Sequence, residues 1–160
     1  MSKKQKKILI IIITTLVVLD QILKIVSLTL NLKIENLDKL GVGILSTEKS
    51  ENNISYILIE IIAIGAIIRY IKSNNSFVKM DSRVVLSIAL AGVISNLIDR
   101  IWKGCVINYI NIPKFTQINL SYIYIIITWI GMAVILTKFT AKRIEEKKNK
   151  KNVTKNANKE

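Results

Sequence analysis

The sequence contains no histidine and only one cysteine in 160 residues. Without histidine, the usual zinc and haem ligand sets cannot be assembled, so we predict no metal site and no cofactor. The single cysteine, Cys105, excludes an intramolecular disulfide. Covalent and metal cross-links therefore play no part in the predicted fold.

Acidic residues are also scarce: 11 Asp and Glu stand against 24 Lys and Arg, which gives a formal charge of +13. Such a surplus is typical of nucleic-acid binding, but no stacking aromatic residues are interleaved with the basic ones. The basic residues instead cluster beside apolar runs, with four in positions 1–7, four in 69–83 and nine in 138–160. This placement follows the positive-inside rule, so we predict a membrane protein with no nucleic-acid partner.

Hydrophobic residues make up 51% of the chain, and the mean hydropathy is +0.40. A water-soluble domain of this size would leave much of that surface unburied. Four apolar runs are long enough to cross a hydrocarbon core of about 30 Å. We therefore predict an all-α membrane protein with one four-helix transmembrane domain, residues 1–139, whose spans cover about 8–30, 54–71, 84–101 and 120–137.

The basic clusters place both termini on the cytoplasmic side, because four spans return the chain to the side where it began. Residues 140–160 lack apolar periodicity and predict a basic, disordered cytoplasmic tail that is attracted to anionic membrane lipid. The connections 31–53 and 102–119 then face outward. Leu40, Val42, Ile44 and Leu45 surround two glycines in the first connection, a pattern that predicts a small β-rich region between the first two helices.

Ionisable residues within the predicted spans need partners or a function, because charge at membrane depth is costly. Asp20 and Lys24 are four residues apart on one helix face and can form an ion pair. They fit a structural pair and a functional one equally well. Glu60 has no local partner and is expected to face other helices.

A second polar group ends the third span, where Asn96 and Arg100 are four residues apart and Asp99 precedes the arginine. Alone, this group fits a helix end with an interfacial arginine. Together with other residues it forms a longer pattern, which consists of Asp20-Gln21 with Lys24, then Ser95-Asn96-Leu97-Ile98-Asp99-Arg100, then Gly104 with Val106, and finally Asn119.

This pattern is similar to that of the bacterial lipoprotein signal peptidases (signal peptidase II). The similarity extends from about residue 8 to 136, and its most specific part is the Asn-Leu-Ile-Asp-Arg run followed by Gly-x-Val. It implies a multi-pass protein of the bacterial cell (inner) membrane and a membrane aspartyl endopeptidase that cuts lipid-modified prolipoproteins. It also implies that Asp20, Lys24, Asn96, Asp99, Arg100 and Asn119 bind substrate or brace the site.

Peptide hydrolysis by a carboxylate dyad needs two carboxyl groups that share a proton, so that one activates water and the other polarises the carbonyl. In the family, the first aspartate follows a Gly-x-Val-Val stretch and precedes Phe-Ile, and the second ends a Phe-Asn-x-Ala-Asp run. Aligned on Gly104 and Asn119, the two catalytic positions hold Asn108 and Tyr122. Neither side chain is a carboxylate base at neutral pH.

The loss of both aspartates predicts a catalytically inactive relative that binds a prolipoprotein or a related lipid-bearing peptide, such as a peptide antibiotic, or that assists an intact relative. Two alternatives remain. One is an active signal peptidase that uses a displaced carboxylate, with Asp99 and Asp20 as its acids. The other is an unrelated small membrane interaction protein or transporter subunit in which the motif match is coincidental.

Overall fold

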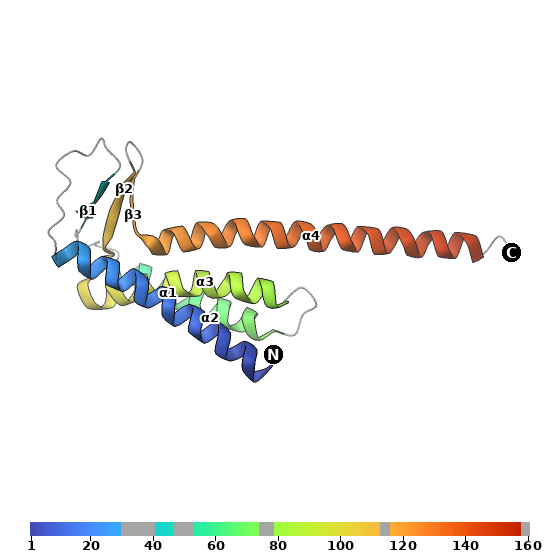
Figure 1. Cartoon of the computed structure of the whole chain (residues 1–160), viewed down its shortest axis with the longest axis horizontal. Helices are drawn as coiled ribbons and strands as arrows, with labels where there is room; N and C mark the ends of the chain where they lie inside the picture. Colours follow the sequence, from blue (N-terminus) through green and yellow to red (C-terminus); the bar gives the residue numbers. More distant parts are fainter. Residues whose placement is uncertain (30–40, 47–52, 74–78, 113–115, 158–160) are drawn as a thin grey trace.

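The computed structural model describes residues 1–29, 41–46, 53–73, 79–112 and 116–157. Within these ranges it contains four helices and three short strands (Figure 1). The helices are α1 (Lys3–Thr29), α2 (Asn53–Lys72), α3 (Met80–Lys103) and α4 (Leu120–Ala157). All four are long and apolar enough to cross a membrane, which confirms the predicted all-α membrane fold.

Helix α3 is the centre of the bundle, because α1, α2 and α4 each pack against it. Small residues allow the close approach of α4. A Cβ atom placed on Gly92 would lie 2.8 Å from the backbone oxygen of Ser121, so only glycine fits at this crossing. The other helices expose large apolar side chains; Trp129 of α4, for example, is 75% exposed. Such surfaces are suited to contact with lipid rather than water.

The strands form one antiparallel sheet in the order β1-β2-β3, with β1 at Gly41–Ser46, β2 at Asn108–Ile112 and β3 at Thr116–Ile118. The pairing of β1 with β2 is irregular between Val42 and Ser46. The predicted β-rich segment is therefore present at Gly41–Ser46, whereas Leu40 lies outside the described residues. The sequence did not predict β2 and β3, which join the second connection to the first.

Helix α4 continues to Ala157, whereas the sequence predicted a disordered tail from residue 140. Lys, Glu and Ala favour helix, and the guanidinium of Arg143 lies 5.1 Å from the ring centroid of Phe139, one turn away. Residues 141–149 are all exposed, as the predicted solvation requires. Figure 1 shows this basic extension projecting beyond the other helices at the end opposite the sheet.

Candidate functional site

An ion-pair triad lies where α1 faces α3, near the sheet. The Nζ atom of Lys24 is 2.7 Å from Oδ2 of Asp20 and 2.7 Å from Oδ2 of Asp99. The three side chains are 0–1% exposed. Burial of these charges is tolerable only because they are paired and hydrogen-bonded. The predicted i, i+4 pair is therefore present, and Asp99 from α3 joins it.

The carboxylate of Asp20 accepts hydrogen bonds at both oxygens. Its Oδ2 accepts from the hydroxyls of Ser95 and Ser121 at 2.6 and 2.7 Å, in addition to the Lys24 ammonium. Its Oδ1 accepts from the hydroxyl of Tyr109 at 3.1 Å. Every neighbour acts as a donor, so the geometry fits an ionised Asp20.

The carboxylate of Asp99 is surrounded in the same way. Besides Lys24, its Oδ2 accepts from the backbone N–H of Ile107 at 3.3 Å, and its Oδ1 accepts from the side-chain amide of Gln21 at 3.1 Å. Within the described residues, no hydrogen bond joins Asp99 to Asp20 directly. The two acids are thus bridged by a cation and do not share a proton.

Asn119 connects this triad to Asn108 and Tyr122, the two positions that the sequence analysis aligned with the family's catalytic aspartates. Its Nδ2 donates to Oδ1 of Asn96 at 3.1 Å and to Oδ1 of Asn108 at 3.2 Å, and it also reaches the carbonyl of Ile107. Its Oδ1 accepts from the backbone N–H of Tyr122 at 3.2 Å. Asn119 is therefore the N-cap of α4, and the start of that helix is fixed to α3 and β2.

Asn108 and Tyr122, the two positions that the sequence alignment pairs with the family's aspartates, both contact Asn119. Both are partly buried. Asn108 is the first residue of β2, and Tyr122 is in the first turn of α4. The side chains at these positions are an amide and a phenol, so this pair provides no carboxylate.

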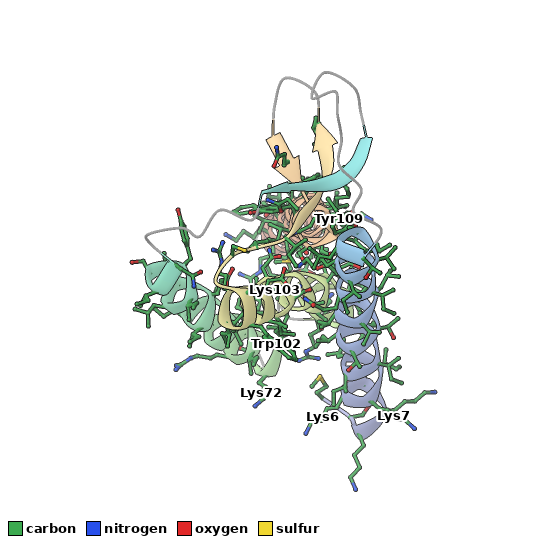
Figure 2. All side chains as sticks on the ribbon, turned by 90° about the vertical axis from the view of Figure 1, so that its left-hand side faces the viewer. Lys6, Lys7, Lys72, Trp102, Lys103 and Tyr109 are labelled. Carbon is green, nitrogen blue, oxygen red and sulfur yellow. The ribbon has the colours of Figure 1, made fainter. Side chains whose placement is uncertain are left out.

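Tyr109 follows Asn108 as the second residue of β2, the middle strand of the sheet (Figure 2). Its hydroxyl donates to Asp20 and accepts the backbone N–H of Leu120 at 3.1 Å. Burial, followed by the negative charge of Asp20, raises the pKa of Tyr109 above its ordinary value. The phenol therefore stays protonated and holds β2, α1 and α4 together.

Arg100 belongs to a separate cluster between α3 and α2. Its Nε donates to Oε1 of Glu60 at 3.1 Å, and its guanidinium carbon lies 4.6 Å from the ring centroid of Tyr56. The side-chain amide of Asn53 donates to the Arg100 carbonyl at 3.2 Å. Glu60 thus has the interhelical position expected of it, with Arg100 as its partner.

Of the predicted site residues, the structure brings together Asp20, Lys24, Asn96, Asp99, Asn108 and Asn119, places Tyr122 at their edge and sets Arg100 apart. Sequence reasoning gave no role to Gln21, Tyr109 or Ser121, although each donates to one of the two acids. Gln21 carried a signal, because it adjoins Asp20 in the motif. Ser121 and Tyr109 carried a weaker signal: each is a polar residue at a position next to an aligned aspartate where the family pattern has an apolar one.

Comparison with known proteins identifies a family and a fold for the chain. The family model described as Signal peptidase (SPase) II matches residues 11–140. A bacterial membrane enzyme solved in meso at 2.3 Å is 23% identical, with 85% of this chain and 91% of that chain covered and a TM-score of 0.72. Another, solved at 1.9 Å, is 24% identical, with coverages of 81% and 92% and a TM-score of 0.68. These structures share the fold. No curated protein sequence matches the chain.

Proposed function

Because the chain belongs to the signal peptidase II family, we propose that it is a non-catalytic member that binds a lipid-bearing peptide without cleaving it. The observation that carries the proposal is the state of the two acids near the dyad positions. Asp20 and Asp99 are buried, bridged by Lys24 and occupied at all four oxygens. A dyad needs a shared proton and access for water, and neither requirement is met by these contacts.

The alternative of a displaced carboxylate is weakened by the same contacts. To act as a base, Asp20 or Asp99 would have to leave an ammonium 2.7 Å away and expose a buried charge. Breaking such a pair typically costs about 3–5 kcal/mol, before any chemistry takes place. The family match also leaves the alternative of an unrelated transporter or interaction subunit without support.

Two further substitutions support a site rebuilt around the ion-pair triad. Where the family pattern has phenylalanine after the first aspartate, this chain has Tyr109, and where it has alanine before the second, it has Ser121. Both changes add a hydroxyl, and both hydroxyls donate to Asp20. The sequence has therefore lost two carboxylates and gained two hydrogen bonds that hold a third carboxylate in place.

The ligand we propose is a prolipoprotein signal peptide. A peptide antibiotic that acts on this family is the second candidate ligand. The cluster at Arg100 supports peptide binding, because Oδ1 of Asn53 and Oε2 of Glu60 are buried without a hydrogen-bond partner in the described part of the chain. Unfilled acceptors of this kind match the N–H groups of a peptide backbone. Asn96, Asp99 and Asn119 would brace the site rather than touch the ligand, since they are buried.

For localisation, we propose the bacterial cell (inner) membrane, with both termini in the cytoplasm and the sheet on the outer side. The basic clusters support this orientation, because Lys3 begins α1, Lys72 ends α2 and Lys79 is the N-cap of α3, and these helix ends lie far from the sheet. Lys142 belongs to the part of α4 that runs on in the same direction, away from the sheet. The polar site then lies toward the outer surface, where a lipid-modified signal peptide is processed by active relatives.

The test is cleavage and binding of a diacylglyceryl-modified prolipoprotein by the purified full-length protein in lipid. The natural protein is compared with Asn108→Asp/Tyr122→Asp and with the fourfold variant that adds Tyr109→Phe and Ser121→Ala. Asn108→Ala/Tyr122→Phe is the matched control, because it alters the same two positions without adding an acid.

We expect the natural protein and the control to bind the substrate without cutting it. We expect measurable cleavage first in the fourfold variant, since only that variant restores the apolar neighbours of the dyad. Cleavage by the natural protein that is lost in Asp20→Asn or Asp99→Asn would overturn the proposal in favour of a displaced carboxylate. Absence of binding by the natural protein would refute the binding role.

A further inference from the structure

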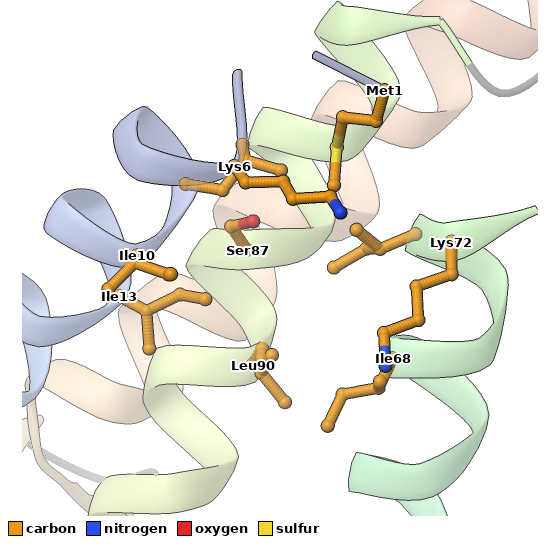
Figure 3. A pocket seen from close by; sticks show the side chains of 10 residues that line it. Met1, Lys6, Ile10, Ile13, Ile68, Lys72, Ser87 and Leu90 are labelled. Atoms are coloured by element: carbon orange, nitrogen blue, oxygen red, sulfur yellow. The ribbon is translucent and has the colours of Figure 1, made fainter. Parts of the chain in front are cut away.

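An apolar groove lies between α1 and α2 at the end of the bundle far from the sheet. Both helices pack on α3 and stand on opposite sides of it, as Figure 2 shows. The cavity has a volume of about 570 Å³. In Figure 3, Ile10 and Ile13 of α1 form one wall, Ile68 of α2 forms the other, and Leu90 of α3 lies between them.

The floor of the groove is apolar. Leu9, Ile71 and Leu90 line it and form one cluster of buried side chains. Ser87 also lines the groove, but its hydroxyl donates to the carbonyl of Arg83 at 2.8 Å and is already used. The interior therefore favours a hydrocarbon chain over a polar ligand.

The end of the groove at Lys6 and Lys72 is positively charged, unlike its apolar interior. Lys6 of α1 and Lys72 of α2 line it from its two sides, and both side chains are exposed (Figure 3). Among the residues described, neither ammonium has an acidic partner. Two unpaired cations at the end of an apolar groove complement a ligand with an anionic head and an apolar tail.

We propose that this groove binds an anionic diacyl phospholipid, with one acyl chain between α1 and α2 and the phosphate between Lys6 and Lys72. The volume is sufficient for a chain, because a methylene takes up about as much space as a water molecule, roughly 30 Å³, and the groove holds on the order of twenty such groups. The ends of α1 and α2 place the two lysines at one membrane face, where phospholipid headgroups lie.

The experiment uses native mass spectrometry of the full-length protein released from micelles that contain equal amounts of phosphatidylglycerol and phosphatidylcholine with identical acyl chains. Three variants accompany the natural protein. Lys6→Gln/Lys72→Gln removes the charges of the groove, and Ile68→Trp fills it. Lys138→Gln/Lys142→Gln makes the same change of charge in exposed residues of α4 that line a different cavity.

We expect the natural protein to retain phosphatidylglycerol about 10- to 30-fold over phosphatidylcholine, because each lysine near the surface contributes about a factor of five. Lys6→Gln/Lys72→Gln should bring this preference close to one, Ile68→Trp should reduce retention of both lipids, and Lys138→Gln/Lys142→Gln should change neither. Equal retention of the two lipids by the natural protein would overturn the proposal. An equal loss in the two lysine double variants would also overturn it, because it would indicate attraction to the surface as a whole.

Discussion

The charged side chains near the two ends of α3 differ in burial and in pairing. At the sheet end, Asp20, Lys24 and Asp99 are buried and bonded to one another. At the other end, Lys6 and Lys72 are exposed, and the groove between them is apolar. Charge at the first end is solvated by protein and holds helices together, whereas charge at the second is left to water and lipid headgroups.

Arg83 is the exception at the basic end. Arg83 is 9% exposed, and its guanidinium donates to the carbonyls of Ile71 and Ser73 at 3.0 and 3.2 Å. A cation that caps the C-terminal carbonyls of α2 stabilises that helix end. A basic cluster that satisfies the positive-inside rule can therefore contain one residue that serves the fold.

The largest effect on stability is expected from Lys24→Met. This variant removes the cation from the sheet end of α3 and leaves two buried acids there without an ion-pair partner. We expect a loss of about 3–5 kcal/mol in the free energy of unfolding, measured by reversible denaturation in detergent. Lys6→Met is the control and should change this free energy by less than about 0.5 kcal/mol. A loss below about 1 kcal/mol for Lys24→Met would mean that the triad is not the structural centre of the sheet end.

Arg83→Met should have the next largest effect, about 1.5–3 kcal/mol, because it removes charged hydrogen bonds to the carbonyl of Ile71 in the last turn of α2 and to that of Ser73, which follows the helix. Hydrogen exchange should rise in the last turn of α2. Lys72→Met is the matched control, since it removes an exposed cation from the same turn. If both variants lost the same free energy of unfolding, Arg83 would stabilise α2 no more than an exposed lysine does.

Gly92→Ala tests the packing of α3 against α4 at the sheet end. The added Cβ would lie 2.8 Å from the backbone oxygen of Ser121, so we expect the helices to separate at a cost of about 1–3 kcal/mol. Gly65→Ala is the counterpart in α2, where the new Cβ meets nothing within 4 Å. That variant should be more stable than the natural protein by about 0.5–1 kcal/mol in thermal unfolding. Similar destabilisation of both would contradict the close approach at Gly92.

The smallest effect is expected from Tyr109→Phe, which removes one hydroxyl and keeps the ring. Asp20 retains three donors, and the N–H of Leu120 loses its acceptor, so we expect a loss of about 1 kcal/mol. Because the pKa of Tyr109 is raised, its hydroxyl is protonated throughout the neutral range, and the difference between variant and natural protein should not change between pH 6 and 9. A difference that disappears toward pH 9 would show that Tyr109 ionises there.

The spans could be predicted from sequence because a bilayer imposes one simple requirement, a long apolar run, on each of them. The pair of Asp20 with Lys24 could also be predicted, since both are on one helix. The place of Asp99 beside Lys24 and of Glu60 beside Arg100 depends on how separate helices pack, which no local pattern records. The similarity to the family pattern partly replaced this missing information, because it assigned Asp99, Asn108 and Asn119 to one site before their contacts were known.

The strands show where local pattern fails. A β-rich region around Val42 and Ile44 was predicted from apolar residues that surround two glycines, and β1 lies there. Thr116–Ile118, in contrast, has only three residues, too few to show a period. Its pairing with β2, not its composition, makes it a strand. The helix from residue 140 onward was missed for another reason. This segment has no apolar face, so its sequence shows no helical repeat of hydrophobic residues, although the intrinsic helix propensity of its residues is favourable.

The pair formed by Asp20 and Lys24 also bears on the order of assembly in the membrane. Both residues belong to α1, which is synthesised before α3, the helix that supplies Asp99. The first helix can therefore enter the bilayer with its two charges already neutralising each other, and it does not have to wait for a partner. The later docking of α3 then adds Asp99 to the pair already formed within α1, and this added contact selects the correct neighbour.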